Sequence, residues 1–141
     1  MKRCLLFISL LLFLFQTPCL SKDYQLRMQV RGHDITGICM MDQSADDGIV
    51  GTVVNEFGMK AFDFIYDNKK VQLLNIVAFL DKWYIRKVLR KDLAFILSQM
   101  EQGVDFKKKS RSIQFKPDGE IEAVNSRYKI YYTFTPMISE Q

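Results

Sequence analysis

The sequence of 141 residues contains 20 lysines and arginines against 16 aspartates and glutamates, which gives a formal net charge of +4. Lys2 and Arg3 lie in an N-terminal segment that we expect to be removed, so the rest of the chain is close to neutral and gives no reason to expect a nucleic-acid partner. Residues 22–141 suffice for one domain with a hydrophobic core and are too few for two.

The first 21 residues have the pattern of a bacterial-type secretory signal. Two positive charges at the N-terminus precede an apolar run from Cys4 to Phe15. This run is shorter than the roughly 20 residues that a membrane-spanning helix needs, so a permanent transmembrane helix is the weaker interpretation. Cys19 and Ser21 are small residues that suit cleavage after Ser21. We therefore predict an exported protein, periplasmic or associated with the outer membrane, whose mature chain begins at Lys22.

Cys19 leaves a second form of export open. A cysteine just after an apolar run can become the lipid-modified first residue of a bacterial lipoprotein, which would hold the domain at a membrane surface. Pro18 precedes it, where such signals normally have a small residue. A lipid anchor at Cys19 is therefore the disfavoured alternative.

Five strands are expected in the first half of the chain. Residues 24–31 alternate strictly, which is typical of a half-buried strand, and further strands are expected over 35–41, 49–54, 59–66 and 71–77. The turns and loops between them are short enough to join antiparallel neighbours. The pattern thus predicts an antiparallel, meandering sheet.

Helical periodicity replaces this alternation over residues 82–102. Leu89, Leu93 and Ile96 fall on one apolar stripe, which predicts an amphipathic helix of about five turns. Asp81 is the expected N-cap, and Gly103 is the expected C-terminal stop. The opposite side of this helix carries Arg86, Lys87, Arg90 and Lys91.

Three more strands are expected over residues 112–116, 120–124 and 127–135, after a basic run at 107–111 that we interpret as a solvated connection. About eight strands and one helix predict an α+β fold. Its expected form is a strongly curved antiparallel sheet, a half-barrel, with the long amphipathic helix against its concave side.

No catalytic or metal-binding group is evident in the sequence. His33 is the sole histidine and lies in a turn next to Asp34, with no evident partner nucleophile. Cys39 falls on a strand face shared with Met41, where a buried, inert thiol is expected. One histidine and one mature cysteine cannot supply a usual zinc site, and there is no phosphate-binding glycine loop. We therefore predict no enzyme activity, no metal and no cofactor.

Two polar features of the predicted helix have both a structural and a functional interpretation. Asp92 falls among apolar positions, so it requires a cation or backbone donors, and structural pairing is the simplest interpretation. The four cations on the opposite side could contact anionic head groups or another protein, and a solvated face is an equally good interpretation.

Several short segments resemble a known family. The turn Asn55–Gly58, the alternating segment Ala61–Ile65, and Val71–Leu73 followed by a helix are similar to the middle of the LolA and LolB group of lipoprotein localisation factors. A closer likeness is to small exported LolB-like proteins of Bacteroidetes type. In these, a segment like Val54–Phe64 precedes a helix that contains a segment like Leu89–Leu93.

The resemblance covers residues 24–103 and implies a half-barrel whose hydrophobic cavity accommodates the acyl chains of a lipid or lipoprotein, without catalysis. The large apolar residues, numerous for one small domain, either fill the concave side of the sheet or leave such a cavity. The expected lining consists of Met28, Val30, Met40, Phe62, Phe64, Tyr66, Leu89, Leu93, Ile96 and Phe134.

Our leading hypothesis is a non-enzymatic cell-envelope protein that binds or transfers a lipid or an acylated, lipoprotein-like ligand in an apolar cavity. The alternative is an envelope protein–protein interaction module with a filled core, which contacts its partner through edge strands or the basic helix face. A third class, an enzyme that acts on envelope lipids or glycans, would need clustered polar groups inside the cavity.

Overall fold

The computed structural model describes residues 21–30, 32–43 and 48–138. The predicted signal peptide up to residue 20, including Cys19, lies outside these residues. The first strand begins at Ser21, so Lys22, the predicted first residue of the mature chain, is its second residue. Among the described residues, no helix is long and apolar enough to cross a membrane.

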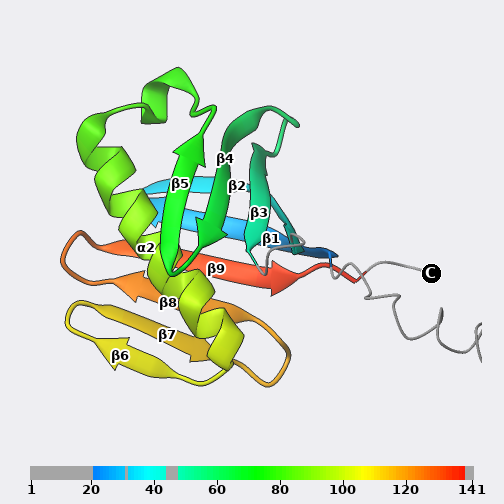
Figure 1. The fold of residues 1–141 in the computed structure, drawn as a ribbon, viewed down its shortest axis with the longest axis vertical. Helices are drawn as coiled ribbons and strands as arrows, with labels where there is room; N and C mark the ends of the chain where they lie inside the picture. Colours follow the sequence, from blue (N-terminus) through cyan, green and yellow to red (C-terminus); the bar gives the residue numbers. More distant parts are fainter. Residues whose placement is uncertain (1–20, 31, 44–47, 139–141) are drawn as a thin grey trace, which may run out of the picture.

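The described residues form one α-helix and one open sheet of nine antiparallel strands (Figure 1). This confirms the predicted α+β class, with one strand more than expected. The helix α2 (Trp83–Gln102) follows the 3-10 helix η1 (Ala78–Leu80). In chain order the strands are β1 (Ser21–Val30), β2 (His33–Gln43), β3 (Ile49–Asn55), β4 (Lys60–Asp67), β5 (Lys70–Leu74), β6 (Phe106–Lys108), β7 (Arg111–Phe115), β8 (Ile121–Asn125) and β9 (Ile130–Pro136).

Strand β1 joins two meanders into this single sheet. The strand order is β5-β4-β3-β2-β1-β9-β8-β7-β6, so β1 pairs with β2 on one side and with the last strand, β9, on the other. Leu26, for example, stands opposite Gly37 of β2 and Phe134 of β9. The two edges of the sheet are therefore β5 and β6.

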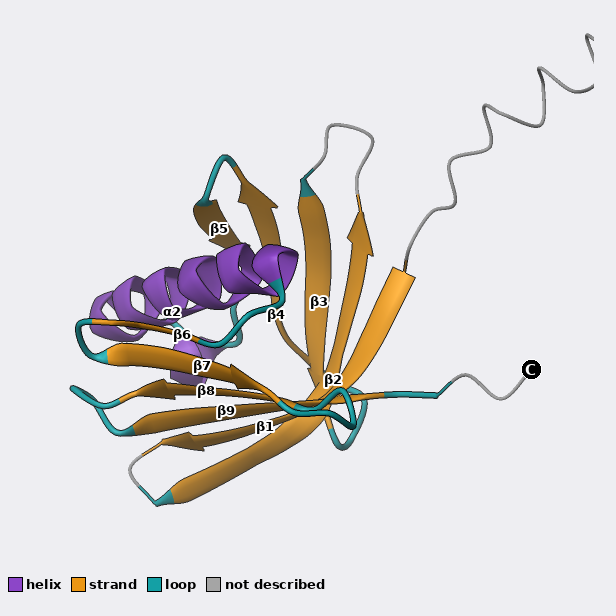
Figure 2. Ribbon diagram, turned by 90° about the horizontal axis from the view of Figure 1, so that it is seen from below, coloured by secondary structure: helices purple, strands orange, loops and turns teal. Residues whose placement is uncertain are grey.

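Helix α2 covers one face of the sheet and contacts the edge strand β5 and, next to the other edge, β7. In Figure 2 the strands on the two sides of β1 run in clearly different directions, and α2 lies between them. The residues of the sheet that face α2 alternate with exposed ones, as the period of a strand requires. The resulting core contains Leu26 and Phe134 at the junction of the meanders and Leu93 and Ile96 on the helix.

Gly51 and Phe64 are directly paired on β3 and β4. The ring of Phe64 lies over Gly51 so closely that a Cβ on Gly51 would come within 2.1 Å of the Phe64 Cζ atom. Only glycine leaves room for the ring here, and the ring in turn covers the backbone that glycine leaves bare.

Several element boundaries differ from the sequence predictions by one to three residues, and two of these differences have a visible structural reason. The N-cap of α2 is Lys82 and not Asp81, because the carboxylate of Asp81 pairs with Arg86 and leaves the helix N-terminus without a side-chain cap. Strand β5 ends at Leu74 and not at residue 77, because Asn75 adopts a left-handed conformation (φ 53°). Gly103 ends the helix as predicted, with φ 67°.

The strand that the sequence analysis did not predict is β6, which overlaps the segment interpreted as a solvated connection. Its three residues are exposed, and they pair with β7 through a turn in which Lys109 has φ 55°. A short, exposed and basic edge strand has no alternating apolar pattern, so the sequence carries no signal for it.

Candidate functional site

Eight of the ten residues predicted to line a cavity are buried in one core cluster. They are Met28, Phe62, Phe64, Tyr66, Leu89, Leu93, Ile96 and Phe134. Val30 is half-buried at the rim of this cluster. Met40 is 39 % exposed, because β2 directs its neighbours Cys39 and Met41 toward the helix and Met40 toward the opposite face. Met40 therefore lies on the face of the sheet away from the rest of the expected lining.

These buried side chains pack against each other. A side chain that lines a cavity of water size keeps area that a water-sized sphere can touch, yet Phe64 is 0 % exposed and Ile96 and Phe134 are each 1 % exposed. In this structure their surfaces are covered by protein atoms, as in an ordinary close-packed core.

Asp92 is the buried polar centre of the interface between helix and sheet. Its Oδ1 accepts hydrogen bonds from Arg111 Nε and Asn125 Nδ2, both at 2.8 Å, and its Oδ2 accepts one from the Tyr132 hydroxyl at 2.6 Å. Of the two kinds of partner expected for Asp92, a cation or backbone donors, the structure provides the cation, Arg111, together with two neutral side-chain donors. Burial, and secondly the charge of Asp92, raise the pKa of Tyr132 well above its usual value, so the phenol stays a donor.

The space beside this network holds only about 10 Å³. That is room for about one water molecule, and an internal site for a substrate would need far more. Asp92 and Tyr132 therefore join α2 to the sheet and present no reactive group to a substrate in this structure.

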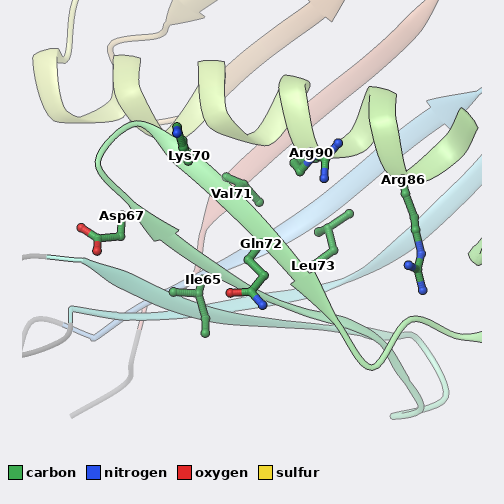
Figure 3. A pocket seen from close by; sticks show the side chains of 8 residues that line it. All are labelled: Ile65, Asp67, Lys70, Val71, Gln72, Leu73, Arg86 and Arg90. Carbon is green, nitrogen blue, oxygen red and sulfur yellow. The ribbon is translucent and has the colours of Figure 1, made fainter. Parts of the chain in front are cut away.

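A larger cleft lies between β5 and the first half of α2 (Figure 3). Its volume is about 450 Å³, within the range of small-ligand and peptide sites. We call it the β5–α2 cleft, and the residues that line it are Ile65, Asp67, Lys70, Val71, Gln72, Leu73, Arg86 and Arg90.

The cleft has an excess of positive charge. Its lining contains three cations, Lys70 of β5 and Arg86 and Arg90 of α2, and one carboxylate, Asp67. Arg86 is already paired with Asp81 at 2.5 Å. Among the described residues, no carboxylate lies within ion-pair distance of Lys70 or Arg90, so these two cations are available to an anionic ligand.

The structure divides the predicted basic face of α2. Arg86 and Arg90 line the cleft, whereas Lys87 and Lys91, also exposed, do not. This division follows from helix geometry, since residues four apart share a stripe and adjacent residues are about 100° apart. The helical periodicity alone grouped all four cations on one side, because it does not show where β5 lies relative to the helix.

A second exposed feature is an apolar end of the molecule. It comprises Phe57 and Met59 in the turn between β3 and β4, Phe79 in η1, and Trp83 and Tyr84 at the start of α2. Figure 1 shows these segments at the same end of the fold. Phe57 is 79 % and Trp83 77 % exposed, and the rings of Trp83 and Tyr84 meet edge to face with centroids 5.9 Å apart.

No family model and no curated protein matches this chain. The resemblance to the LolA and LolB group thus stays a prediction from the short segments quoted above.

The remaining candidates for chemistry stay apart. His33 is exposed at the start of β2, and the neighbouring Asp34 accepts a hydrogen bond from Arg27 Nη2 at 2.7 Å. Among the residues that the structure describes, no three histidine, cysteine, aspartate or glutamate side chains are placed to hold a metal ion.

Cys39 is buried on the inner face of β2, as predicted. Burial, and secondly the charge of Asp23, raise the pKa of its thiol to about 12. Because the thiolate is the reactive form, we expect Cys39 of the folded protein to be alkylated by iodoacetamide at pH 8 about a thousandfold more slowly than in urea. Peptide mass spectrometry that resolves Cys39 measures both rates, and equal rates would contradict the burial.

Proposed function

We propose that this is a non-enzymatic cell-envelope protein that binds lipid, either a membrane surface or the acyl part of a lipoprotein-like ligand, through its apolar end. In this proposal the sheet is the half-barrel expected from the sequence, and α2 occupies its concave side. The domain is exported and acts in the periplasm or at the outer membrane.

The observation that carries the proposal is the exposure of Phe57, Met59, Phe79 and Trp83 at one end of the fold, each between 63 % and 79 % exposed. Large apolar side chains exposed at the same end of a small domain often mark a surface that contacts lipid or protein. Trp and Tyr prefer the boundary between head groups and acyl chains, where one part of the ring system is apolar and the other is wet.

Nearby cations favour lipid over an apolar protein surface. Lys82, the N-cap of α2, directly precedes Trp83 and Tyr84, and Lys87 follows them on the first turns of the helix; both lysines are exposed. Each lysine or arginine near an anionic membrane surface contributes about 1 kcal/mol of attraction. Aromatic anchors combined with basic residues are typical of interfacial membrane binding.

The interior supports this placement of the contact at the end of the molecule. Eight of the ten predicted cavity residues are buried in one core cluster, so an acyl chain could enter the concave side only if α2 moved away from the sheet. Contact at the apolar end needs no such movement.

Trp83 provides a direct test, because it is the chain's single tryptophan. We expect its fluorescence emission to shift to shorter wavelength when the protein is mixed with vesicles of phosphatidylglycerol, and much less with phosphatidylcholine alone. Bromine-labelled acyl chains should quench it. The double substitution F57S/F79S should weaken vesicle binding about tenfold or more, because each side chain loses about 1.5–3 kcal/mol of apolar burial.

The matched control is V104S. Val104 is 64 % exposed, the same as Phe79, but it follows the other end of α2. Binding by V104S should equal that of the unchanged protein. An emission spectrum that stays the same with every vesicle, together with native mass spectra free of bound lipid, would overturn the proposal.

The filled interior also favours the second candidate, an interaction module without a ligand cavity. That candidate predicts a protein partner and no vesicle binding. Native mass spectrometry of the protein purified from cells separates the two, since lipid adducts are expected only for the first.

A further inference from the structure

Strand β5 is an edge of the sheet, and its free side opens into the β5–α2 cleft. Four consecutive residues, Lys70 to Leu73, line this cleft (Figure 3). Because side chains alternate along a strand, the cleft meets β5 from both of its faces and therefore runs along the edge itself.

The backbone of β5 has N–H and C=O groups that do not pair with β4. Lys70 to Leu74 pair with Asp67 to Asp63 of β4 in register, and in an antiparallel pair alternate residues direct their N–H and C=O groups away from the partner strand. Among the described residues, no backbone or side-chain group bonds to these outward groups of β5. Such an edge is a template for another extended chain.

The size of the cleft suits a short strand. Five residues in extended conformation span about 17 Å. An added strand of similar length would lie between β5 and the α2 residues Arg86 and Arg90. The cleft, with a volume of about 450 Å³, is already present in the structure.

The lining specifies the chemistry of such a strand. Ile65, Val71 and Leu73 supply apolar contacts, and Lys70 and Arg90 supply positive charges that no described carboxylate neutralises. Asp67 is the one carboxylate in the lining. The complementary ligand is an extended segment that carries both apolar and acidic side chains.

We propose that the β5–α2 cleft binds an extended acidic peptide segment of another protein, which adds to the sheet as a strand beside β5. The outward backbone groups of β5 hold the main chain, and Lys70 and Arg90 select acidic side chains. This site is separate from the apolar end, so the proposal does not rest on lipid binding.

The test uses the protein as cells produce it and a fluorescein-labelled hexapeptide of alternating glutamate and valine. We expect saturable binding by fluorescence anisotropy and protection of β5 amides from hydrogen exchange when the peptide is bound. The double substitution K70E/R90E should weaken binding about tenfold or more, because it replaces two attractive charges with repulsive ones.

K87E/K91E is the matched control, since it makes the same change of charge on exposed lysines of α2 outside the cleft. It should bind the peptide as the unchanged protein does, and F57S/F79S should too. A hexapeptide with lysine in place of glutamate should not bind.

Three results would overturn the proposal. They are no saturable binding, equal weakening by K70E/R90E and K87E/K91E, or binding that leaves β5 amides unprotected. Displacement of the peptide by anionic vesicles from the unchanged protein, with K70E/R90E deficient in vesicle binding, would assign the cleft to lipid head groups instead.

Discussion

Replacing Asp92 with alanine is expected to lower the free energy of unfolding by about 3–5 kcal/mol, the usual cost of removing one partner from a buried charged network. Asp92 accepts all three of its hydrogen bonds from Arg111, Asn125 and Tyr132. Asp92→Ala leaves the buried Asn125 amide and Tyr132 hydroxyl without their acceptor and Arg111 without its counter-charge. Urea unfolding followed by circular dichroism measures the loss.

The control for this prediction is Asp92→Asn, which keeps the size of the side chain and one acceptor oxygen. Its loss should be clearly smaller than that of Asp92→Ala. Equal stability of the unchanged protein and Asp92→Ala, within about 1 kcal/mol, would show that the network contributes nothing to the packing of α2 on the sheet.

The same network has a signature at high pH. The folded protein raises the pKa of Tyr132 above the value in the unfolded chain, so the contribution of the protonated phenol is complete below about pH 10 and is lost as the pH rises above it. The pKa values of Tyr24 and Tyr66 are raised too, mainly by burial. Tyr132→Phe should therefore reduce the loss of stability above pH 10 without abolishing it.

The local patterns in the sequence predicted the elements that bury one face. Alternation identified β1 and β4, and the stripe through Leu89, Leu93 and Ile96 identified the buried side of α2. These patterns depend on short-range geometry, which the sequence contains in full. The same reasoning indicated that Asp92 needs a cation or backbone donors.

The partners of Asp92 could not be named in this way. Arg111, Asn125 and Tyr132 lie 19, 33 and 40 residues further along the chain, on three different strands. Only the pairing of β7, β8 and β9 brings them to one point beneath the helix. A buried Asn at the end of a strand is the one signal that a search for polar core residues could have used.

The candidate cleft was missed for a related reason. Its walls are Lys70 to Leu73 on β5 and Arg86 and Arg90 on α2. The two meanders of the sheet are joined through the pairing of β1 with β9, and this strand order leaves β5 at one end of the sheet. Strand order is a long-range property, and a sequence of antiparallel hairpins is compatible with several orders.

Phe64→Ala is expected to lower the free energy of unfolding by about 3–5 kcal/mol, and this substitution separates a filled interior from the cavity predicted by sequence. Phe64 is fully buried, and its ring covers Gly51 on the neighbouring strand. Removing a ring that fills a close-packed core costs its transfer free energy and leaves a void.

The matched control is Phe57→Ala, which deletes the same ring where it is 79 % exposed, in the turn after β3. It should change stability by no more than about 0.5 kcal/mol. If Phe64 instead lined an open cavity for an acyl chain, its ring would already face space, no new void would form, and the two substitutions would have similar small effects. A loss below about 1 kcal/mol for Phe64→Ala would therefore favour an acyl chain in the concave side of the sheet, and a loss of 3 kcal/mol or more places lipid contact outside it.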